Sequence, residues 1–203
     1  MLSGLKGRRV AILAADGVEQ VELEEPRRAL DEAGAVTEIV SLKPGEIQGF
    51  NHLDKGKKFK VDHTLEEVQA SQYDALMLPG GVANPDALRM DPKAVQFVRE
   101  FMVADKPVAA ICHAPWLLVE AGAVAGRTLT SWPSLQTDIR NAGGHWVDAE
   151  VQVDGTLVTS RKPDDLPAFN AAMCKEFANR MDEAQVDRAS EQSFPASDPP
   201  AYM

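Results

Sequence analysis

Short apolar runs alternate along the chain with segments of helical periodicity. Runs typical of strands in a buried sheet occur at 10–14, 36–42, 75–78 and 107–111. Apolar residues at helical spacing predict helices at 23–33, 92–104, 115–121 and 133–142. A last helix is expected to open near Pro163, with Leu166, Phe169, Met173 and Phe177 on one face. Strands that alternate with helices predict an α/β fold with a largely parallel sheet.

Two further segments read as β-hairpins. Residues 45–61 are rich in Gly and Lys, and we interpret their lysines as a solvated edge. Residues 151–159 contain an Asp-Gly turn between apolar positions. Pro26 is expected in the first turn of its helix, where a missing N–H costs least.

Composition and charge exclude several classes of protein. The 203 residues carry a net charge of −10 and are 44% hydrophobic, which is ordinary globular composition. A nucleic-acid binder would need a basic face, and the negative net charge argues against one. A membrane-spanning helix would need about 18 consecutive apolar residues, and the sequence contains no such run. The start of the chain lacks the apolar stretch of a signal peptide, and two cysteines make no disulfide framework. We therefore expect a cytoplasmic protein that binds neither nucleic acid nor membrane.

The chain divides into a main domain and an extension. Residues 1–179 have the length of one α/β domain. Residues 180–203 hold 2 basic and 5 acidic side chains and are rich in Ser and Pro. This composition predicts a flexible acidic extension.

Cys112 is the strongest candidate for chemistry. It lies between the run ending at Ile111 and a helix beginning at Pro115, as in the nucleophile elbow of hydrolases. A tight strand-to-helix turn exposes its side chain at the sheet edge, near the positive end of a helix, which favours a thiolate. The backbone N–H that follows is free to stabilise an oxyanion. The alternative interpretation is a buried cysteine that ends a core strand.

Other candidates lie after neighbouring strands. His113 could serve as a base, or it could be a histidine without a role. Gly80 and Gly81 allow close approach of a ligand, or form a plain turn. A protonated Glu19 could donate a hydrogen bond to a thiolate and lower the thiol pKa. Glu22, Glu24 and Glu25 could instead make this an acidic first helical turn, and spacing does not choose among them.

The remaining motifs suggest no metal or cofactor. Cys174 lies within an amphipathic helix, and we interpret it as structural or semi-exposed. His52, His63 and His145 lack the spacing of a zinc site, and no Gly-rich phosphate loop occurs.

Several separated motifs occur in the order found in the DJ-1/PfpI superfamily. They are EQVEL at 19–23, LPGG at 78–81, KPVAAICH at 106–113, AGGHWVD at 142–148, VTSR at 158–161 and PDDLP at 163–167. From about residue 9 to 177 the chain resembles the branch of PfpI-like intracellular proteases and general stress proteins. The resemblance implies a flavodoxin-like three-layer sandwich and a homodimer or hexamer.

The resemblance also assigns roles to residues. Cys112 would be the nucleophile, His113 its neighbour in the site, and Glu19 the carboxyl beside the thiol. Gly81 and the His113 backbone would form the oxyanion hole. In the hexameric proteases a neighbouring subunit's carboxylate orients the histidine, and Asp86 is the matching position. Two departures are Ala114, in place of the usual Gly, and Trp132, where the proteases often carry Tyr.

Two classes of function follow. The first is a stress-protective cysteine enzyme that acts on reactive carbonyls, as glyoxalases and deglycases do, or hydrolyses peptides or amides. A buried thiol needs no extended cleft, so we favour the small carbonyl. The second is a redox-responsive stress protein or holdase chaperone that uses an oxidisable Cys112 without turnover.

Overall fold

The computed structural model describes residues 4–192, and for residues 180–192 it describes the backbone alone. Its core is a seven-stranded sheet in the order β11-β12-β8-β7-β1-β3-β6. All neighbouring pairs are parallel except β11 with β12. The strands are β1 (Arg9–Leu13), β3 (Val36–Ser41), β6 (His63–Thr64), β7 (Ala75–Leu78), β8 (Val108–Ile111), β11 (Val151–Asp154) and β12 (Leu157–Ser160). This arrangement confirms the predicted α/β class.

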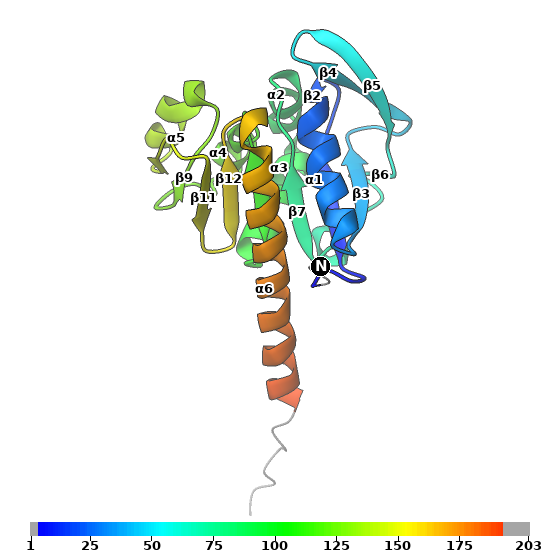
Figure 1. Cartoon of the computed structure of the whole chain (residues 1–203), viewed down its shortest axis with the longest axis vertical. Coiled ribbons are helices and arrows are strands. Elements are labelled where there is room, and N and C mark those ends of the chain that lie inside the picture. The colour runs from blue at the N-terminus through cyan, green and yellow to red at the C-terminus, as the bar shows by residue number, and fades with distance from the viewer. Residues whose placement is uncertain (1–3, 193–203) are drawn as a thin grey trace, which may run out of the picture.

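Helices cover both faces of this sheet and make three layers (Figure 1). One face packs against α1 (Gln20–Glu32) and α6 (Leu166–Gln192), through Leu23, Leu30, Phe169, Met173 and Phe177. The other face packs against α3 (Pro92–Val103), α4 (Pro115–Glu120) and α5 (Gln136–Asn141). Successive residues of a strand point to opposite faces, so Val10 and Ile12 join the first core while Ala11 and Leu13 join the second.

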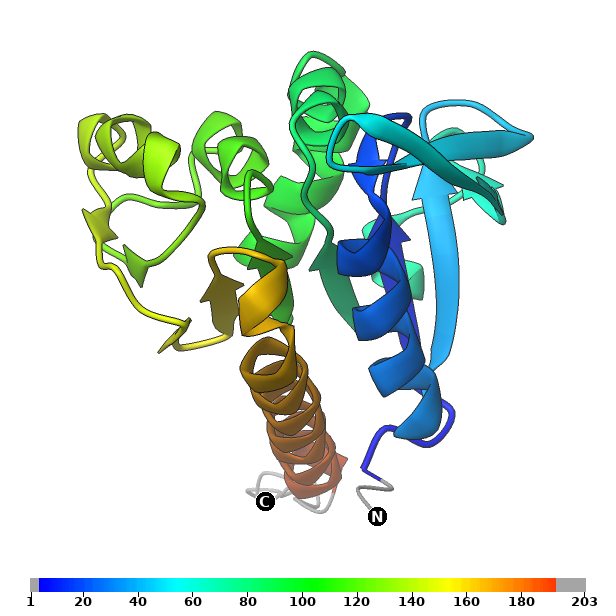
Figure 2. The same ribbon diagram turned by 45° about the horizontal axis from the view of Figure 1, so that its top comes forward.

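Smaller elements surround the carboxyl end of the sheet. The antiparallel hairpin of β4 (Glu46–Asn51) and β5 (Asp54–Lys60) pairs with β2 (Val18–Glu19) and lies at that end (Figure 2). The helix α2 (Ala83–Arg89) lies there too. The strands β9 (Thr128–Leu129) and β10 (His145–Trp146) form a separate pair. Short 3-10 helices occur at Ala70–Gln72, Pro133–Leu135 and Pro163–Asp165.

Two features of the helices differ from the sequence prediction. Pro26 lies within α1 rather than in its first turn, because α1 begins at Gln20. A proline there removes the hydrogen bond to the carbonyl four residues earlier, that of Glu22. The short helix α2 was not predicted, since Asn84-Pro85 favours a turn.

Helix α6 continues past the predicted domain boundary at residue 179. Its backbone is helical to Gln192, so the start of the predicted extension prolongs the last helix of the domain beyond the sandwich (Figure 1). Residues 193–203 lie outside the described residues. The division of the chain into domain and extension stays a prediction. Among the described residues, no helix is both long and apolar enough to cross a membrane.

Candidate active site

A strained turn places Cys112 at the carboxyl end of β8. Its φ of 63° lies in the left-handed region, which costs a residue with a Cβ about 1–2 kcal/mol. Two main-chain hydrogen bonds secure the turn: the Cys112 N–H donates to Ser160 at 3.1 Å, and the Trp132 N–H donates to the Cys112 carbonyl at 2.8 Å. The geometry is that of the predicted nucleophile elbow. Ala114 has φ −54° and ψ −31°, so its Cβ fits the helical turn that follows.

The Cys112 side chain forms part of the floor of a pocket of about 410 Å³. Cys112 is only 6% exposed. The pocket is bounded by the loop after β1, the loop after β7, the β4–β5 hairpin and the segment that carries Trp132. Its lining residues are Gly17, Glu19, Glu22, Phe50, His52, Leu53, Gly81, Val82, Ala83, Cys112, His113, Trp132 and Pro163.

The carboxyl group that faces the thiol is that of Glu22. Glu22 is completely buried, and neither of its oxygens makes a hydrogen bond of normal geometry with the described residues. Burial raises its pKa to about 8, the Glu19 charge adds to this shift, and the nearby Cys112 thiol and Gly80 and Gly81 N–H groups oppose it. Glu22 therefore carries its proton at pH 7.

This finding corrects the sequence prediction for Glu19. Glu19 lines the same pocket, but its carboxylate accepts a hydrogen bond from the His52 N–H at 3.1 Å. It is the residue just before α1, whereas Glu22 lies in the first turn of that helix and reaches the thiol. The helix begins earlier than Pro26 suggested, and this shift brings Glu22 to the site.

Opposing effects act on the Cys112 thiol. Burial raises its pKa, and a negative charge on Glu22 would raise it further, while the N–H groups of Gly81 and His113 lower it by donating toward the sulfur. The sequence predicted a low thiol pKa, and burial opposes that expectation. The repulsion from Glu22 is absent while Glu22 keeps its proton. Helix α4 is six residues long, so its dipole adds little.

The histidine beside the thiol is held between two tryptophans. His113 Nδ1 lies 3.1 Å from the Cys112 sulfur. The Trp132 ring stacks on His113 with centroids 5.6 Å apart, and the Trp116 ring lies at 5.2 Å. Burial lowers the pKa of His113 to about 4, so the imidazole is neutral at pH 7 and can accept a proton. No sequence pattern indicated that Trp116 lies beside the histidine.

Close contacts leave no room for a side chain at the two glycines after β7. A Cβ on Gly80 would lie 2.5 Å from the Cys112 Cβ and collide with the Glu22 carboxyl group. A Cβ on Gly81, whose φ is +83°, would lie 2.7 Å from the Glu19 nitrogen. Both residues thus allow the backbone to approach the thiol, and the Gly81 and His113 N–H groups that converge on the sulfur can stabilise an oxyanion there.

Asn84 holds this loop in place. Its side chain is buried, accepts from the Ala15 N–H at 2.7 Å, and donates to the Pro79 and Gly80 carbonyls at 2.8 and 3.0 Å. It therefore connects the loops after β1 and β7. No sequence signal indicated this role beyond the position of an amide shortly after Gly81.

Asp86 is not brought to the thiol within one chain. It lies on α2 outside the pocket lining, and its Oδ1 accepts from Arg89 Nε at 3.0 Å and Nη2 at 2.7 Å. The Arg89 guanidinium in turn lies 4.6 Å over the Trp116 ring. A role for Asp86 across a subunit interface stays a prediction.

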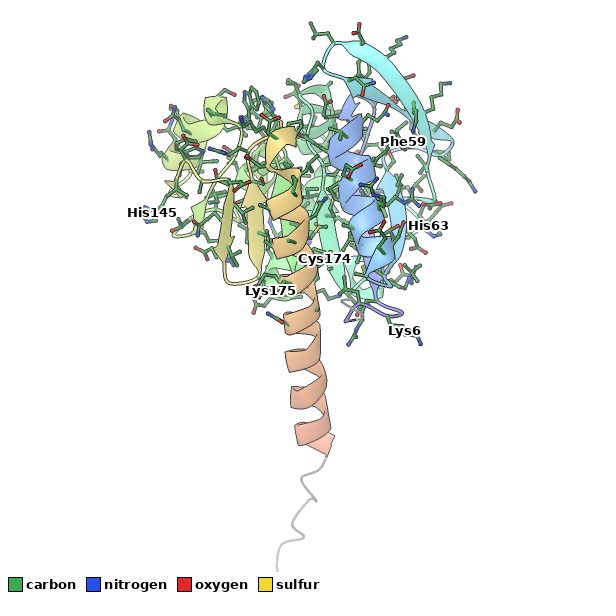
Figure 3. All side chains as sticks on the ribbon, viewed as in Figure 1. Lys6, Phe59, His63, His145, Cys174 and Lys175 are labelled. Carbon is green, nitrogen blue, oxygen red and sulfur yellow. The ribbon has the colours of Figure 1, made fainter. Side chains whose placement is uncertain are left out.

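The other cysteine and histidines lie elsewhere. Cys174 is buried on α6, and burial raises the pKa of its thiol to about 11 (Figure 3). His63 and His145 lie at opposite sides of the molecule (Figure 3). Among the described residues, no group of three or more His, Cys, Asp or Glu side chains is placed to hold a metal ion. His52, by contrast, lines the pocket, a position that its sequence context did not indicate.

Fold and site together define an α/β protein with a cysteine on a nucleophile elbow, beside a protonated carboxyl group. The family model of the DJ-1/PfpI family matches residues 8–176, and the chain belongs to that family. A deglycase of Pyrococcus abyssi is 46% identical over 161 residues, which cover 79% of this chain and 94% of the relative. General stress protein 18 of Bacillus subtilis is 42% identical over 169 residues, covering 81% and 94%.

A solved structure agrees with this assignment. Drosophila melanogaster DJ-1beta superposes with a TM-score of 0.77 at 26% identity, over 90% of this chain and 97% of that one. The chain is therefore a member of a family that includes stress-related enzymes.

Proposed function

We propose that the protein is a cysteine-dependent enzyme that converts reactive α-oxoaldehydes, free or as adducts on amines and thiols, to 2-hydroxy acids. The observation that carries this proposal is the pair of Cys112 and the buried, protonated Glu22, which line the same pocket. An extended polypeptide would need an open groove to reach a thiol that is 6% exposed. The names of the relatives support a deglycase and a stress-protective role. On that likeness we also propose a cytoplasmic location.

The first step is addition to the aldehyde. The Cys112 sulfur attacks the aldehyde carbon while neutral His113 accepts the thiol proton at Nδ1. The carbonyl electron pair moves to oxygen, where the Gly81 and His113 N–H groups stabilise it. Return of the proton from His113 to that oxygen gives a hemithioacetal.

The second step is an internal redox reaction. Neutral His113 accepts the proton from the former aldehyde carbon, and the electron pair of that C–H bond forms a double bond to the adjacent carbon while its carbonyl oxygen takes up the hydroxyl proton of the first carbon. His113 then returns its proton to the adjacent carbon, so the first carbon rises to the thioester level and the second becomes a carbinol. Water then hydrolyses the thioester, releases the 2-hydroxy acid and returns the thiol. The net reaction adds one water to the aldehyde to give the 2-hydroxy acid, and it requires no external oxidant or reductant. From an adduct, the amine or thiol leaves as well.

The test is consumption of methylglyoxal by the purified protein, with lactate as the measured product. Wild type should form lactate, and Cys112→Ala should lose at least about 100-fold in kcat/KM, because the nucleophile is gone. Cys174→Ala is the matched control and should keep wild-type activity, since Cys174 lies on α6 outside the pocket lining.

Other outcomes would contradict the proposal. Hydrolysis of peptides without lactate formation would identify a peptidase instead. Suppression of protein aggregation by wild type and Cys112→Ala alike, with no turnover of either substrate, would identify a holdase.

A further inference from the structure

The pocket above Cys112 is large and mostly apolar. Its volume of about 410 Å³ lies within the range of about 300–1,000 Å³ found for sites that bind drug-sized ligands. Phe50, Val82, Trp132 and Pro163 contribute to its walls. Methylglyoxal, with five non-hydrogen atoms and a single methyl group, would leave most of this surface in contact with water. The shape therefore favours a carbonyl compound with a larger apolar body.

The rim of the pocket presents exposed apolar side chains. Leu53, at the turn of the β4–β5 hairpin, is 94% exposed, and Val82 and Trp132 are exposed as well. These three are among only seven large apolar side chains that are exposed in the described part of the chain. Exposed apolar side chains gathered around one opening mark a binding surface more than scattered ones do. A ligand seated over Cys112 would cover them.

The hairpin turn that carries Leu53 is tied to the pocket. His52, just before it, adopts a left-handed φ of 57°, and its N–H donates to the Glu19 carboxylate at 3.1 Å. Glu19 itself pairs with Phe50 across β2 and β4. The position of Leu53 at the rim therefore depends on a hydrogen bond from within the pocket.

The negative charge in the pocket should also discriminate against anionic substrates. The charge in its described lining is negative, because Glu19 is a carboxylate, Glu22 keeps its proton, and no Lys or Arg lines the pocket. The lysines Lys55, Lys57, Lys58 and Lys60 belong to β5 and are absent from this lining. An anionic group held near Glu19 would be repelled and would find no cation to pair with.

We propose that this site selects α-oxoaldehydes with an uncharged aryl or branched alkyl group over methylglyoxal, and rejects those whose body is anionic. The inference rests on the proposed function, since it names the substrate class of the same site. The aldehyde carbon would lie at the Cys112 sulfur, and the apolar body would extend between Trp132 and the hairpin turn. The chemistry is that given above, so phenylglyoxal plus water yields mandelate.

The experiment compares three aldehydes with the full chain: methylglyoxal, phenylglyoxal and 4-carboxyphenylglyoxal. Lactate, mandelate and 4-carboxymandelate are quantified by chromatography, and the rate with Cys112→Ala is subtracted as the uncatalysed background. We expect kcat/KM for phenylglyoxal to exceed that for methylglyoxal by about 10-fold or more, as for other apolar substrate groups in apolar pockets. The carboxylated analogue should be at least about 10-fold poorer than phenylglyoxal.

Two variants test whether Leu53 and Glu19 determine these substrate preferences. Leu53→Ser should lower the ratio of phenylglyoxal to methylglyoxal kcat/KM about fivefold, since part of the leucine surface is lost. Val103→Ser is the matched control, because Val103 is an exposed apolar residue of α3 outside the pocket lining, and it should leave the ratio unchanged. Glu19→Gln should raise the rate with the carboxylated analogue relative to phenylglyoxal.

The outcomes separate the two proposals. No Cys112-dependent product from any aldehyde would overturn the proposed function itself. Turnover of methylglyoxal with a phenylglyoxal ratio at or below one, or a ratio that Leu53→Ser does not change, would overturn the substrate selection and leave the proposed function standing. Equal rates with phenylglyoxal and its carboxylated analogue would overturn the selection by charge.

Discussion

At the scale of single residues, a thiol, a carboxylic acid and an imidazole share one buried site. Cys112, Glu22 and His113 are all buried, and burial favours the uncharged form of each group. The resting site therefore holds a thiol, a protonated acid and a neutral imidazole. Charge develops only when a substrate carbonyl accepts the sulfur's electron pair, beside donors already in place.

The buried acid should make stability depend on pH. Because the Glu22 pKa is raised from 4.5 to about 8, the folded chain binds more protons than the unfolded chain between these values. The unfolding free energy should fall as pH rises through this window, by up to about 1.4 kcal/mol per pH unit from this group. His113 acts with the opposite sign below pH 6.5, because its pKa is lowered to about 4.

Comparison with Glu22→Gln isolates the acid. The difference in unfolding free energy between wild type and Glu22→Gln, measured by urea titration from pH 5 to pH 9, should decline with pH and level off above about 8. The same comparison in a Cys112→Ala background should keep the slope, since burial is the largest cause of the shift. A pH-independent difference would show that Glu22 ionises as it does in the unfolded chain.

At the scale of elements, the strands were predictable and the contacts of the loops were not. Strand 75–78 and the hairpins were confirmed because continuous apolar runs and turn residues report directly on burial. Which side chains of α1 face the thiol depends on the residue at which this helix begins. Pro26 suggested a later start, and with that start Glu19 and Glu22 could not be distinguished. The tertiary contact of Glu22 with the loop after β7 decides between them.

The contacts of Asn84 could not be read from the sequence either, because they join two loops that are 69 residues apart. Asn84→Ala should lower the unfolding free energy by about 2–3 kcal/mol, since buried backbone groups lose their partners. It should also lower kcat about 10- to 100-fold, because the Gly81 N–H would no longer be fixed at the oxyanion.

Two variants sharpen this test. Asn84→Asp keeps the acceptor for Ala15 but loses both donors, so it should impair kcat as well. Asn141→Ala, at the exposed end of α5, should change the unfolding free energy by less than about 0.5 kcal/mol and leave kcat unchanged. Wild-type kcat in Asn84→Ala would show that the loop after β7 is positioned without it.

At the scale of the whole molecule, the strand ends gather the site at one end of the sandwich, while α6 extends toward the opposite end (Figures 1 and 2). In the proposed mechanism, one chain supplies the nucleophile, the acid and the oxyanion donors. Among the described side chains, none places a carboxylate against His113, whose ring neighbours are Trp116 and Trp132. Asp86 lies on α2, where its carboxylate accepts from Arg89, whose guanidinium lies over the Trp116 ring. The resemblance that predicted a homodimer or hexamer also predicted that Asp86 acts on a neighbouring subunit.

Complementation between subunits tests this prediction. Wild type should sediment as a dimer or hexamer, and Asp86→Ala should keep that mass while losing at least about 10-fold in kcat/KM for methylglyoxal, because an orienting partner of the base is gone. Cys112→Ala should be inactive for lack of a nucleophile. When the two variants are unfolded together and refolded, mixed oligomers pair an intact Cys112 with an intact Asp86 of another subunit. Activity should then rise above the sum of the separate variants, whereas a site complete within one chain would show no rise.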